Sequence, residues 1–414
     1  MKTDLNCKIK TKFSVITDWL TTQKKNIPQL LYTSVDLRES LYKAASIDTN
    51  IFPAGFNNLC HLNYIKIQTE LQKFLQHYPN SKQILLFCED HTRNRFYLEN
   101  IYQLANIIEQ AGYLVTICSF FNEHPTICTN NGYLILNTVQ DHSVTIYCLD
   151  YLLKSKAYTF DICLLNNDFS EGNFDKLKEL NIPIIPHPNL GWHQRKKSIH
   201  IETLNQLTNL MIKDCDISVD PWQLSTLIEL CHNIDINNEN DREIIAKKSE
   251  SLFNKIKEKY KENKIKDRPY LVLKSDNGTY GMGVISIEHP EEILSLNRKK
   301  RNKLHKGKGS IPIQNLLLQE GVSTVSQVDQ ANSEEVIYNF NGETVGGFYR
   351  IHPKKTDKDI LNSKGMIFKS FCSNQNQTCS IHQPTCGVKK NISMTSYVLA
   401  QLANLAAQKE TVIL

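Results

Sequence analysis

The stretch "LVLKSDNGTYGMGVISI", residues 271–287, constrains the fold most, because it places a lysine and three glycines between two apolar, strand-like runs. Glycine tolerates positive φ and lets backbone N–H groups approach a ligand, and a lysine on a strand supplies a point charge for phosphate oxygens. Lys274 with Gly278, Gly281 and Gly283 therefore predicts a cover over nucleotide phosphates. The alternative is a hairpin whose glycine turn follows an incidental lysine.

The order of residues in this stretch excludes two common phosphate-binding loops. A Walker loop needs its lysine directly after the last glycine, with Ser or Thr next. A Rossmann fingerprint needs G-x-G-x-x-G at the start of a helix, whereas this segment returns into a strand. The sequence therefore indicates a strand–loop–strand nucleotide site.

Composition sets the class of protein and its surroundings. With 414 residues, 41% hydrophobic and 22% charged, the chain has enough length for two or three domains with ordinary cores. No run of about eighteen apolar residues exists, and "MKTDLNCKIKTKF" at the N-terminus contains no apolar segment before a cleavage site. We therefore expect a cytoplasmic protein with no membrane partner.

The net charge of +5 is concentrated in "NRKKRNKLHKGKG", residues 297–309. Such runs are usually solvated loops or helix ends, and no aromatic residues alternate with these charges as base stacking would need. We therefore expect no nucleic-acid partner. The sequence does not predict the oligomeric state.

Two blocks after the glycine-rich stretch resemble a known fold. "NLLLQEGV" (315–322) ends an apolar strand in polar residues, and "EEVIYNFNGETVGGFYRIH" (334–352) reads as two strands around an Asn-Gly turn. Strand lysine, glycine loop, helix, "QEGV" and a hairpin ending in "YR" occur in the order found in the ATP-grasp fold. This resemblance implies that the lysine contacts ATP phosphates, that a hinge backbone binds adenine and that a later arginine holds the transferring phosphoryl group. Carried over, it implies roles for Lys274, Gln319, Glu320, Val322, Arg350 and, in "ILNSKG", Asn362.

ATP-grasp proteins usually place two acidic strands for magnesium at the end of the domain, and this chain stops instead at "TVIL". Candidate strands lie near the N-terminus, where "LLYTSVDLRES" contains Asp36 and "AASIDTNIFPAGFNNL" contains Asp48 and Asn50. Alternate residues of a strand share one face, and magnesium prefers carboxylate and amide oxygens. We therefore predict a circularly permuted ATP-grasp in which Asp36, Asp48 and Asn50 hold two magnesium ions. Alternatively, Asp36 caps a helix and Asp48 lies in a turn.

Six blocks together resemble the proteobacterial glutamate–cysteine ligase family of ATP-grasp type. They run from residue 30 to about 370 and are "VDLRESLYKAASIDTNIFPAGFNNLC", "EDHTRNRFYLENI", "GWHQRKKSIH", "LVLKSDNGTYGMGVISI", "LLLQEGV" and "VGGFYRIHP". The resemblance implies that ATP phosphorylates the γ-carboxylate of glutamate and that the amine of cysteine then attacks the acyl phosphate. Residues 371–390 match no family pattern; their Cys372, Cys379, Cys386 and His382 are a loose candidate zinc set.

The α-carboxylate of glutamate would suit the planar fork of an arginine. Arg38 is one candidate, and Arg93, Asn94 and Arg95 form another after the strand "ILLFCED", where ligands of open α/β sheets bind. The alternative for these arginines is surface pairing with Glu89, Asp90 or Glu99. In "HPNLGWHQRKKSIH" (187–200), similarity to related ligases makes Arg195 and Lys197 candidates for phosphate contact.

Changes in pattern divide the chain. Residues 84–190 alternate short β-branched runs with helical patterns and predict an open α/β sheet, and from about 220 the chain becomes helical and rich in Lys and Glu. We predict an N-terminal segment (1–60), a substrate domain (61–215) and an ATP-grasp nucleotide-binding domain (216–414). A glutathione synthetase-like or other carboxylate–amine ligase, and a non-catalytic nucleotide-binding regulator, are the alternative functions.

Overall fold

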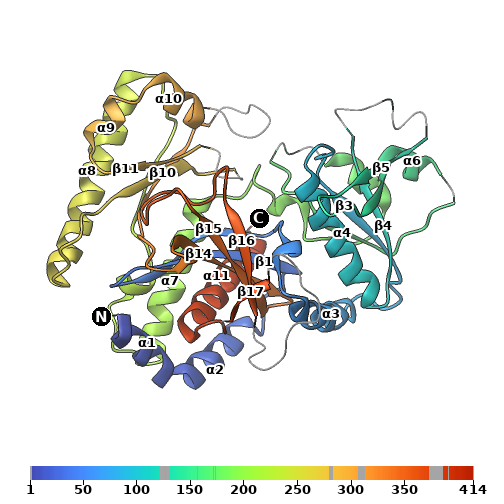
Figure 1. Ribbon diagram of the computed structural model, residues 1–414, viewed down its shortest axis with the longest axis horizontal. Coiled ribbons are helices and arrows are strands. Elements are labelled where there is room, and N and C mark those ends of the chain that lie inside the picture. Colours follow the sequence, from blue (N-terminus) through green and yellow to red (C-terminus); the bar gives the residue numbers. More distant parts are fainter. Residues whose placement is uncertain are drawn as a thin grey trace.

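Three β-sheets organise the chain in the computed structural model (Figure 1). The structure describes residues 2–121, 126, 131–155, 157–170, 172, 174–278, 283–305, 313–372, 386–389 and 391–413. One sheet with its helices forms the right-hand part of the view, a second lies at the centre above a layer of helices, and the third forms the upper left. Among the described residues, no helix is long and apolar enough to cross a bilayer.

The six-stranded sheet is the predicted open α/β sheet. In spatial order its strands are β5 (Tyr133–Asn137), β6 (Ser143–Cys148), β4 (Leu114–Ser119), β3 (Gln83–Cys88), β7 (Ile162–Asn166) and β8 (Ile184–Ile185). All neighbours are parallel except β5, which runs antiparallel to β6. Its region also contains α3 (His61–Leu75), α4 (Arg95–Gln110), α6 (Leu149–Lys154) and the short helices η2 (Asp175–Leu180) and η3 (Pro188–Leu190).

The central sheet joins the two ends of the chain. Its strands follow the order β17 (Cys386–Lys389), β16 (Ile367–Cys372), β15 (Glu343–His352), β14 (Ala331–Phe340), β1 (Tyr32–Glu39) and β2 (Ala44–Asn50), with β13 (Gln327–Val328) on β14. The N-terminal strand β1 thus pairs antiparallel with both β14 and β2. At the β14–β15 turn, Asn341 and Gly342 have φ of 49° and 77°, as the Asn-Gly signal predicted.

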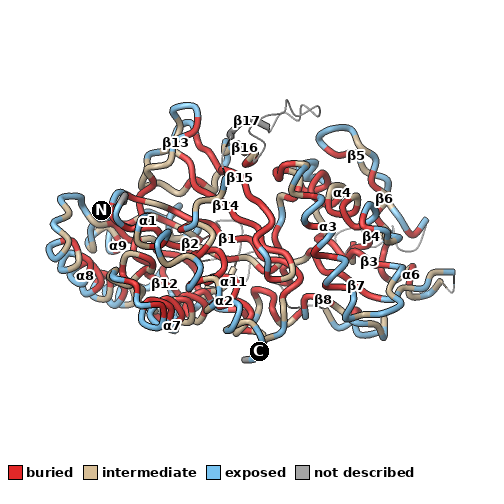
Figure 2. The backbone as a smooth tube through the Cα atoms, turned by 90° about the horizontal axis from the view of Figure 1, so that it is seen from below, coloured by how far each residue is buried: buried red, intermediate tan, exposed pale blue. Residues whose placement is uncertain are grey.

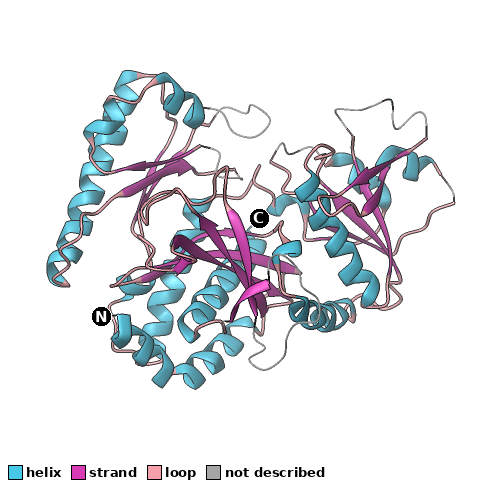
Figure 3. Cartoon of the chain, viewed as in Figure 1, coloured by secondary structure: helices cyan, strands magenta, loops and turns pink. Residues whose placement is uncertain are grey.

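Four helices cover one face of the central sheet (Figure 3). They are α1 (Lys2–Thr11), α2 (Phe13–Lys24), α7 (Lys197–Asp214) and α11 (Met394–Ile413). Because side chains alternate along a strand, Val35 and Leu37 of β1 join this helical core while Asp36 and Arg38 point to the opposite face. Helix α7 therefore packs with α11, outside the six-stranded unit, although the predicted substrate domain (61–215) includes it.

The third sheet is antiparallel and small. Its strands are β11 (Val284–Ile287), β10 (Leu271–Ser275), β12 (Leu316–Glu320) and β9 (Ile228–Cys231). It is accompanied by α8 (Glu239–Glu262), α9 (Glu291–Leu294), α10 (Arg298–His305) and η4 (Pro221–Leu224). The outer helix α8 keeps one buried side, whereas β1, β14 and β15 of the central sheet are buried along most of their length (Figure 2).

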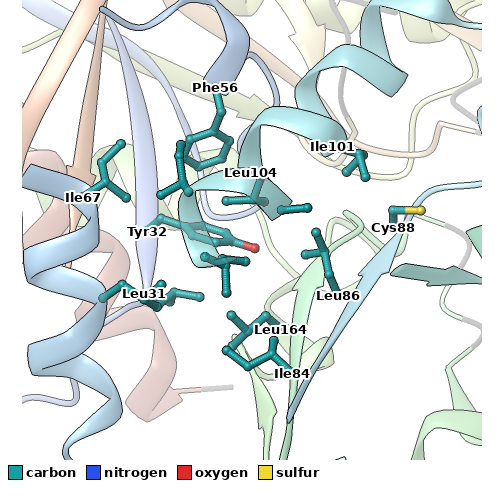
Figure 4. Packing of buried hydrophobic residues seen from close by; sticks show 14 of the residues in the cluster. Leu31, Tyr32, Phe56, Ile67, Ile84, Leu86, Cys88, Ile101, Leu104 and Leu164 are labelled. Carbon is teal, nitrogen blue, oxygen red and sulfur yellow. The ribbon is translucent and has the colours of Figure 1, made fainter. Parts of the chain in front are cut away.

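One apolar core connects the central sheet to the six-stranded sheet (Figure 4). Tyr32 of β1 packs edge-on against Phe56 of η1 (Phe56–Asn58), and the same cluster includes Ile84, Leu86 and Leu164 of the six-stranded sheet. The Tyr32 hydroxyl donates a hydrogen bond to the carbonyl of Leu165. These two units therefore share their hydrophobic core.

Candidate active site

A cavity lies between the small antiparallel sheet and the open face of the central sheet. Most residues predicted for nucleotide, metal and catalysis meet in its wall. Those lining it are Asp36, Arg38, Asp48, Lys197, Lys274, Gly278, Gln319, Glu320, Val322, Arg350 and Asn362. Residues from both ends of the chain therefore build one site.

Lys274 lies near the end of β10 and is only 5% exposed. Its Nζ donates to the carbonyl of Ile47 at 3.1 Å. That carbonyl is available because Asp36 opposes Asp48 whereas Leu37 opposes Ser46, so Ile47 is the extra residue of a β-bulge. Burial lowers the pKa of Lys274 to about 8, against the opposing charge of Asp48. The site thus contains a cation that an added anion would stabilise.

The glycine-rich loop has the backbone that its sequence predicts at both ends. Gly278 and Gly283 have φ of 118° and 66°, which favour glycine, whereas Gly281 lies outside the described residues. At the base of the loop, Asn277 donates to the carbonyls of Trp192 and Arg195 at 3.2 and 3.0 Å. The loop base is therefore tied to the segment that precedes α7.

Two predicted metal ligands face each other across β1 and β2. Asp36 and Asp48 are direct cross-strand partners, which places their side chains on the same face of the sheet. Asp48 also pairs with Lys197 at 3.1 Å, and Lys197 lies 3.6 Å from the centroid of the Trp192 ring. Burial alone would raise the pKa of Asp48, but Lys197 and Lys274 outweigh it and hold that pKa below its usual value.

Arg350 belongs to a buried chain of alternating charges. Its Nη1 lies 2.6 Å from both Asp36 Oδ2 and Glu334 Oε1, and Glu334 continues to Arg38 Nε at 2.7 Å. Burial raises the pKa of Asp36 to about 6, although Arg350 opposes the shift. Arg350 Nε has no hydrogen-bond partner within the described ranges. The guanidinium of Arg350 is therefore held by two carboxylates in the cavity wall, and its Nε is buried.

Glu334 was not among the residues predicted from the sequence, although part of its signal was present. Counting back from the Asn-Gly turn, a regular hairpin pairs Asn339 with Thr344 and would place Ser333 opposite Arg350. Tyr338 pairs with Gly346, so Val345 is the extra residue of a β-bulge. This bulge shifts the register by one residue, so that Glu334 opposes Arg350. The bulge could not be read from the alternation of the strand alone.

The oxygen ligands in the cavity wall are of the type that magnesium prefers, but they are few. Asp36, Asp48 and Glu334 supply carboxylate oxygens from one cavity wall, and the raised pKa of Asp36 indicates that another cation beside it would be favourable. Asn50 of β2 opposes Ser34 of β1 and does not line the cavity. No group of three or more His, Cys, Asp or Glu is arranged for a metal in the described part of the chain, and Cys379 and His382 lie outside it.

Arg195 lies behind the cavity wall instead of in it. Its guanidinium is 1% exposed and pairs with Glu410 of α11 at 2.7 Å, while Nη1 donates to the carbonyl of Thr49. His200 contacts the same carboxylate, and a hydrogen bond of 2.9 Å joins its Nε2 to Thr49 Oγ1. Arg195 thus connects β2 to α11.

The candidate glutamate clamps are separated. Arg38 lines the main cavity, but its guanidinium is engaged by Glu334 and, at 2.6 Å, by the carbonyl of Asp359. Arg93, Asn94 and Arg95 line a second, open hollow after β3. There Asn94 caps α4, and Arg95 forms a surface ion pair with Asp141 and donates to the carbonyl of Thr138.

The hinge strand β12 and neighbouring apolar side chains complete the cavity. Its apolar wall is made by Tyr270, Val272, Val284, Val322 and Leu361. The N–H of Val322 makes no hydrogen bond within the part of the chain that the structure describes, whereas the preceding Gly321 N–H donates to the carbonyl of Tyr270 at 2.8 Å. An apolar wall with a backbone donor at its edge suits a purine base.

Comparison with known proteins assigns the family. The family model GshA, glutamate-cysteine ligase, matches residues 7–411. A candidate gamma-glutamylcysteine synthetase from Methylobacillus flagellatus KT superposes with a TM-score of 0.83 at 32% identity, covering 99% of this chain and 96% of that chain. A search of curated proteins finds no match.

Two other solved structures are more distant. D-alanyl-alanine synthetase A from Vibrio cholerae O1 biovar eltor has a TM-score of 0.31 at 15% identity, covering 72% of this chain and 76% of that chain. D-cycloserine synthetase DcsG has a TM-score of 0.38 at 11% identity, with coverage of 80% and 82%. From the nearly full-length family match, this chain belongs to the ATP-dependent glutamate–cysteine ligases, the enzymes that form γ-glutamylcysteine.

Proposed function

We propose that the cavity between the small sheet and the central sheet binds ATP and magnesium and performs both steps of γ-glutamylcysteine formation. The convergence of Lys274, Arg350 and the Asp36–Asp48 pair in one wall carries this proposal. These groups come from β10, β15, β1 and β2, so tertiary structure alone unites them. The chemistry needs mainly positioning and neutralisation of phosphate charge.

The residues have distinct roles in this proposal. Lys274 and Lys197 hold the phosphates beneath the glycine-rich loop, and the N–H of Val322 binds the adenine edge. Arg350 neutralises charge on the transferring phosphoryl group, and Asp36 and Asp48 would hold two magnesium ions. When bound, magnesium would neutralise the phosphate oxygens during transfer.

The proposed reaction has two steps. An oxygen of the glutamate γ-carboxylate attacks the γ-phosphorus of ATP, and ADP leaves with the electrons of the broken bond. The amine nitrogen of cysteine then attacks the acyl carbon, loses a proton and expels phosphate. Arg93 and Arg95 stay predictions for the α-carboxylate, and Asn362, which lines the cavity, for the substrate side.

We further infer that the fold is a circularly permuted ATP-grasp. The support is the position of β1, which lies between β14 and β2 and brings the N-terminal carboxylates beside Arg350. Asp48→Ala should lower the rate of magnesium-dependent turnover at least about a hundredfold, because it removes a proposed metal ligand. Titration with magnesium checks this, and unchanged magnesium dependence would contradict the inference.

The activity test is ADP release with MgATP and L-glutamate, with and without L-cysteine, while γ-glutamylcysteine is followed by mass. We expect ADP and dipeptide in equal amounts, both dependent on cysteine and both lost in Lys274→Ala. ADP release driven by another amine, with no response to cysteine, would favour a different carboxylate–amine ligase. Nucleotide binding without turnover would favour a regulatory protein.

A further inference from the structure

The hinge residue Glu320 has a side chain that the proposed chemistry does not use. Its carboxylate is fully buried and accepts hydrogen bonds from Trp222 Nε1 at 3.0 Å and from the backbone N–H of Leu227 at 3.0 Å. The backbone of Glu320 is also held, because its N–H donates to the carbonyl of Leu227 at 2.8 Å. The end of the hinge strand is therefore fixed through this one residue.

A lysine from a distant turn completes this arrangement. Lys43 Nζ lies 2.9 Å from Glu320 Oε1, and neither side chain is exposed to solvent. The same ammonium lies 4.2 Å from the centroid of the Trp222 ring. Next to it, Tyr42 stacks on Trp222 with an angle of 3° between the rings. The turn that contains Tyr42 and Lys43 therefore docks against the small sheet.

Lys43 lies in the turn between β1 and β2, so the ion pair joins this hairpin to the hinge. Ser40 N–H donates to the Lys43 carbonyl at 2.8 Å and closes the turn between β1 and β2. Those two strands carry Asp36 and Asp48, so a single hairpin reaches the proposed metal ligands and the hinge. Stability alone does not require two buried charges, since apolar residues of similar size often serve as well. In some proteins a buried ion pair is retained because it specifies one register between the elements that it joins.

We propose that Lys43 is a positioning residue, which holds the hinge through Glu320 in the place where its backbone binds the adenine base. This inference rests on the proposed nucleotide site in the cavity. Lys43 does not line that cavity and would touch no part of the nucleotide. Its loss should therefore weaken binding of the base without changing contacts to the phosphates.

Adenosine and ATP together separate base binding from phosphate binding. Lys43→Met alone leaves the Glu320 charge buried and unpaired, so the test uses the double variant Lys43→Met with Glu320→Gln, which removes both charges. Its affinities for adenosine and for ATP, measured by calorimetry, should fall by the same factor of about ten. Lys274→Met is the matched control, because it should weaken ATP binding and leave adenosine binding unchanged.

The outcomes can be distinguished. Lys43→Arg keeps the charge and should retain most of the adenosine affinity. Wild-type affinity for adenosine in a folded double variant would overturn the positioning role while leaving the nucleotide site intact. A wild-type protein that binds neither adenosine nor ATP would overturn the proposed site itself, and the inference with it.

Discussion

At the scale of single residues, the proposed site depends on a lysine with a shifted pKa. Burial lowers the pKa of Lys274 to about 8, so the free protein loses this charge as the pH rises through that value. Phosphate binding needs the charged form. We therefore expect the affinity for MgATP, measured by calorimetry, to fall above pH 8, approaching about tenfold per pH unit.

Lys274→Arg provides the control, because a guanidinium stays charged throughout this range. In that variant the decrease near pH 8 should disappear even if the affinity is lower overall. A flat profile in the wild-type protein, or the same decrease in Lys274→Arg, would show that another group titrates.

At the scale of elements, the buried Arg195–Glu410 ion pair joins the segment before α7 to α11 behind the site. Burial alone would raise the pKa of Glu410, but Arg195 and His200 outweigh it and lower the pKa to about 2 from the usual 4.5. Because the folded-state pKa is the lower one, this carboxylate stabilises the fold above about pH 4.5, and the stabilisation is lost as the pH falls towards 2.

Glu410→Gln should lower the free energy of unfolding by about 3–5 kcal/mol at pH 7, because it leaves the Arg195 charge buried and unpaired. Urea unfolding measures this, and the difference from wild type should shrink at pH 3. The control is Glu202→Gln on the exposed side of α7, for which a change within about 0.5 kcal/mol is expected. Equal effects of the two substitutions would contradict the structural role.

At the scale of the whole molecule, the shared apolar core should make the central and six-stranded sheets unfold together. Tyr32 is 1% exposed and lies where they meet (Figure 4). Tyr32→Ala should cost about 3–5 kcal/mol, as large-to-small core substitutions do. Transitions followed by tryptophan fluorescence and by far-ultraviolet circular dichroism should shift together. A shift in only one signal would indicate that the sheets unfold independently.

Local signals in the sequence account for much of the site. A lysine before a glycine loop, an Asn-Gly turn and alternating acidic residues on a strand are short-range patterns, because φ preferences and the two-residue period of a strand act within a few positions. They predicted the glycine conformations at both ends of the loop, Gly278 and Gly283, and the hairpin at 334–352, whereas Asn50, which was expected to share the face of Asp48, does not line the cavity. Resemblance over several blocks predicted the family, which the nearly full-length match confirms.

Only the tertiary structure decided which distant groups meet. Two β-bulges shift strand register by one residue, which frees the Ile47 carbonyl for Lys274 and places Glu334 opposite Arg350. The partners of buried charges, such as Lys43 with Glu320, lie hundreds of residues apart. Strand and turn preferences are local free energies that a sequence shows directly, whereas register and charge pairing minimise the free energy of the whole packed chain.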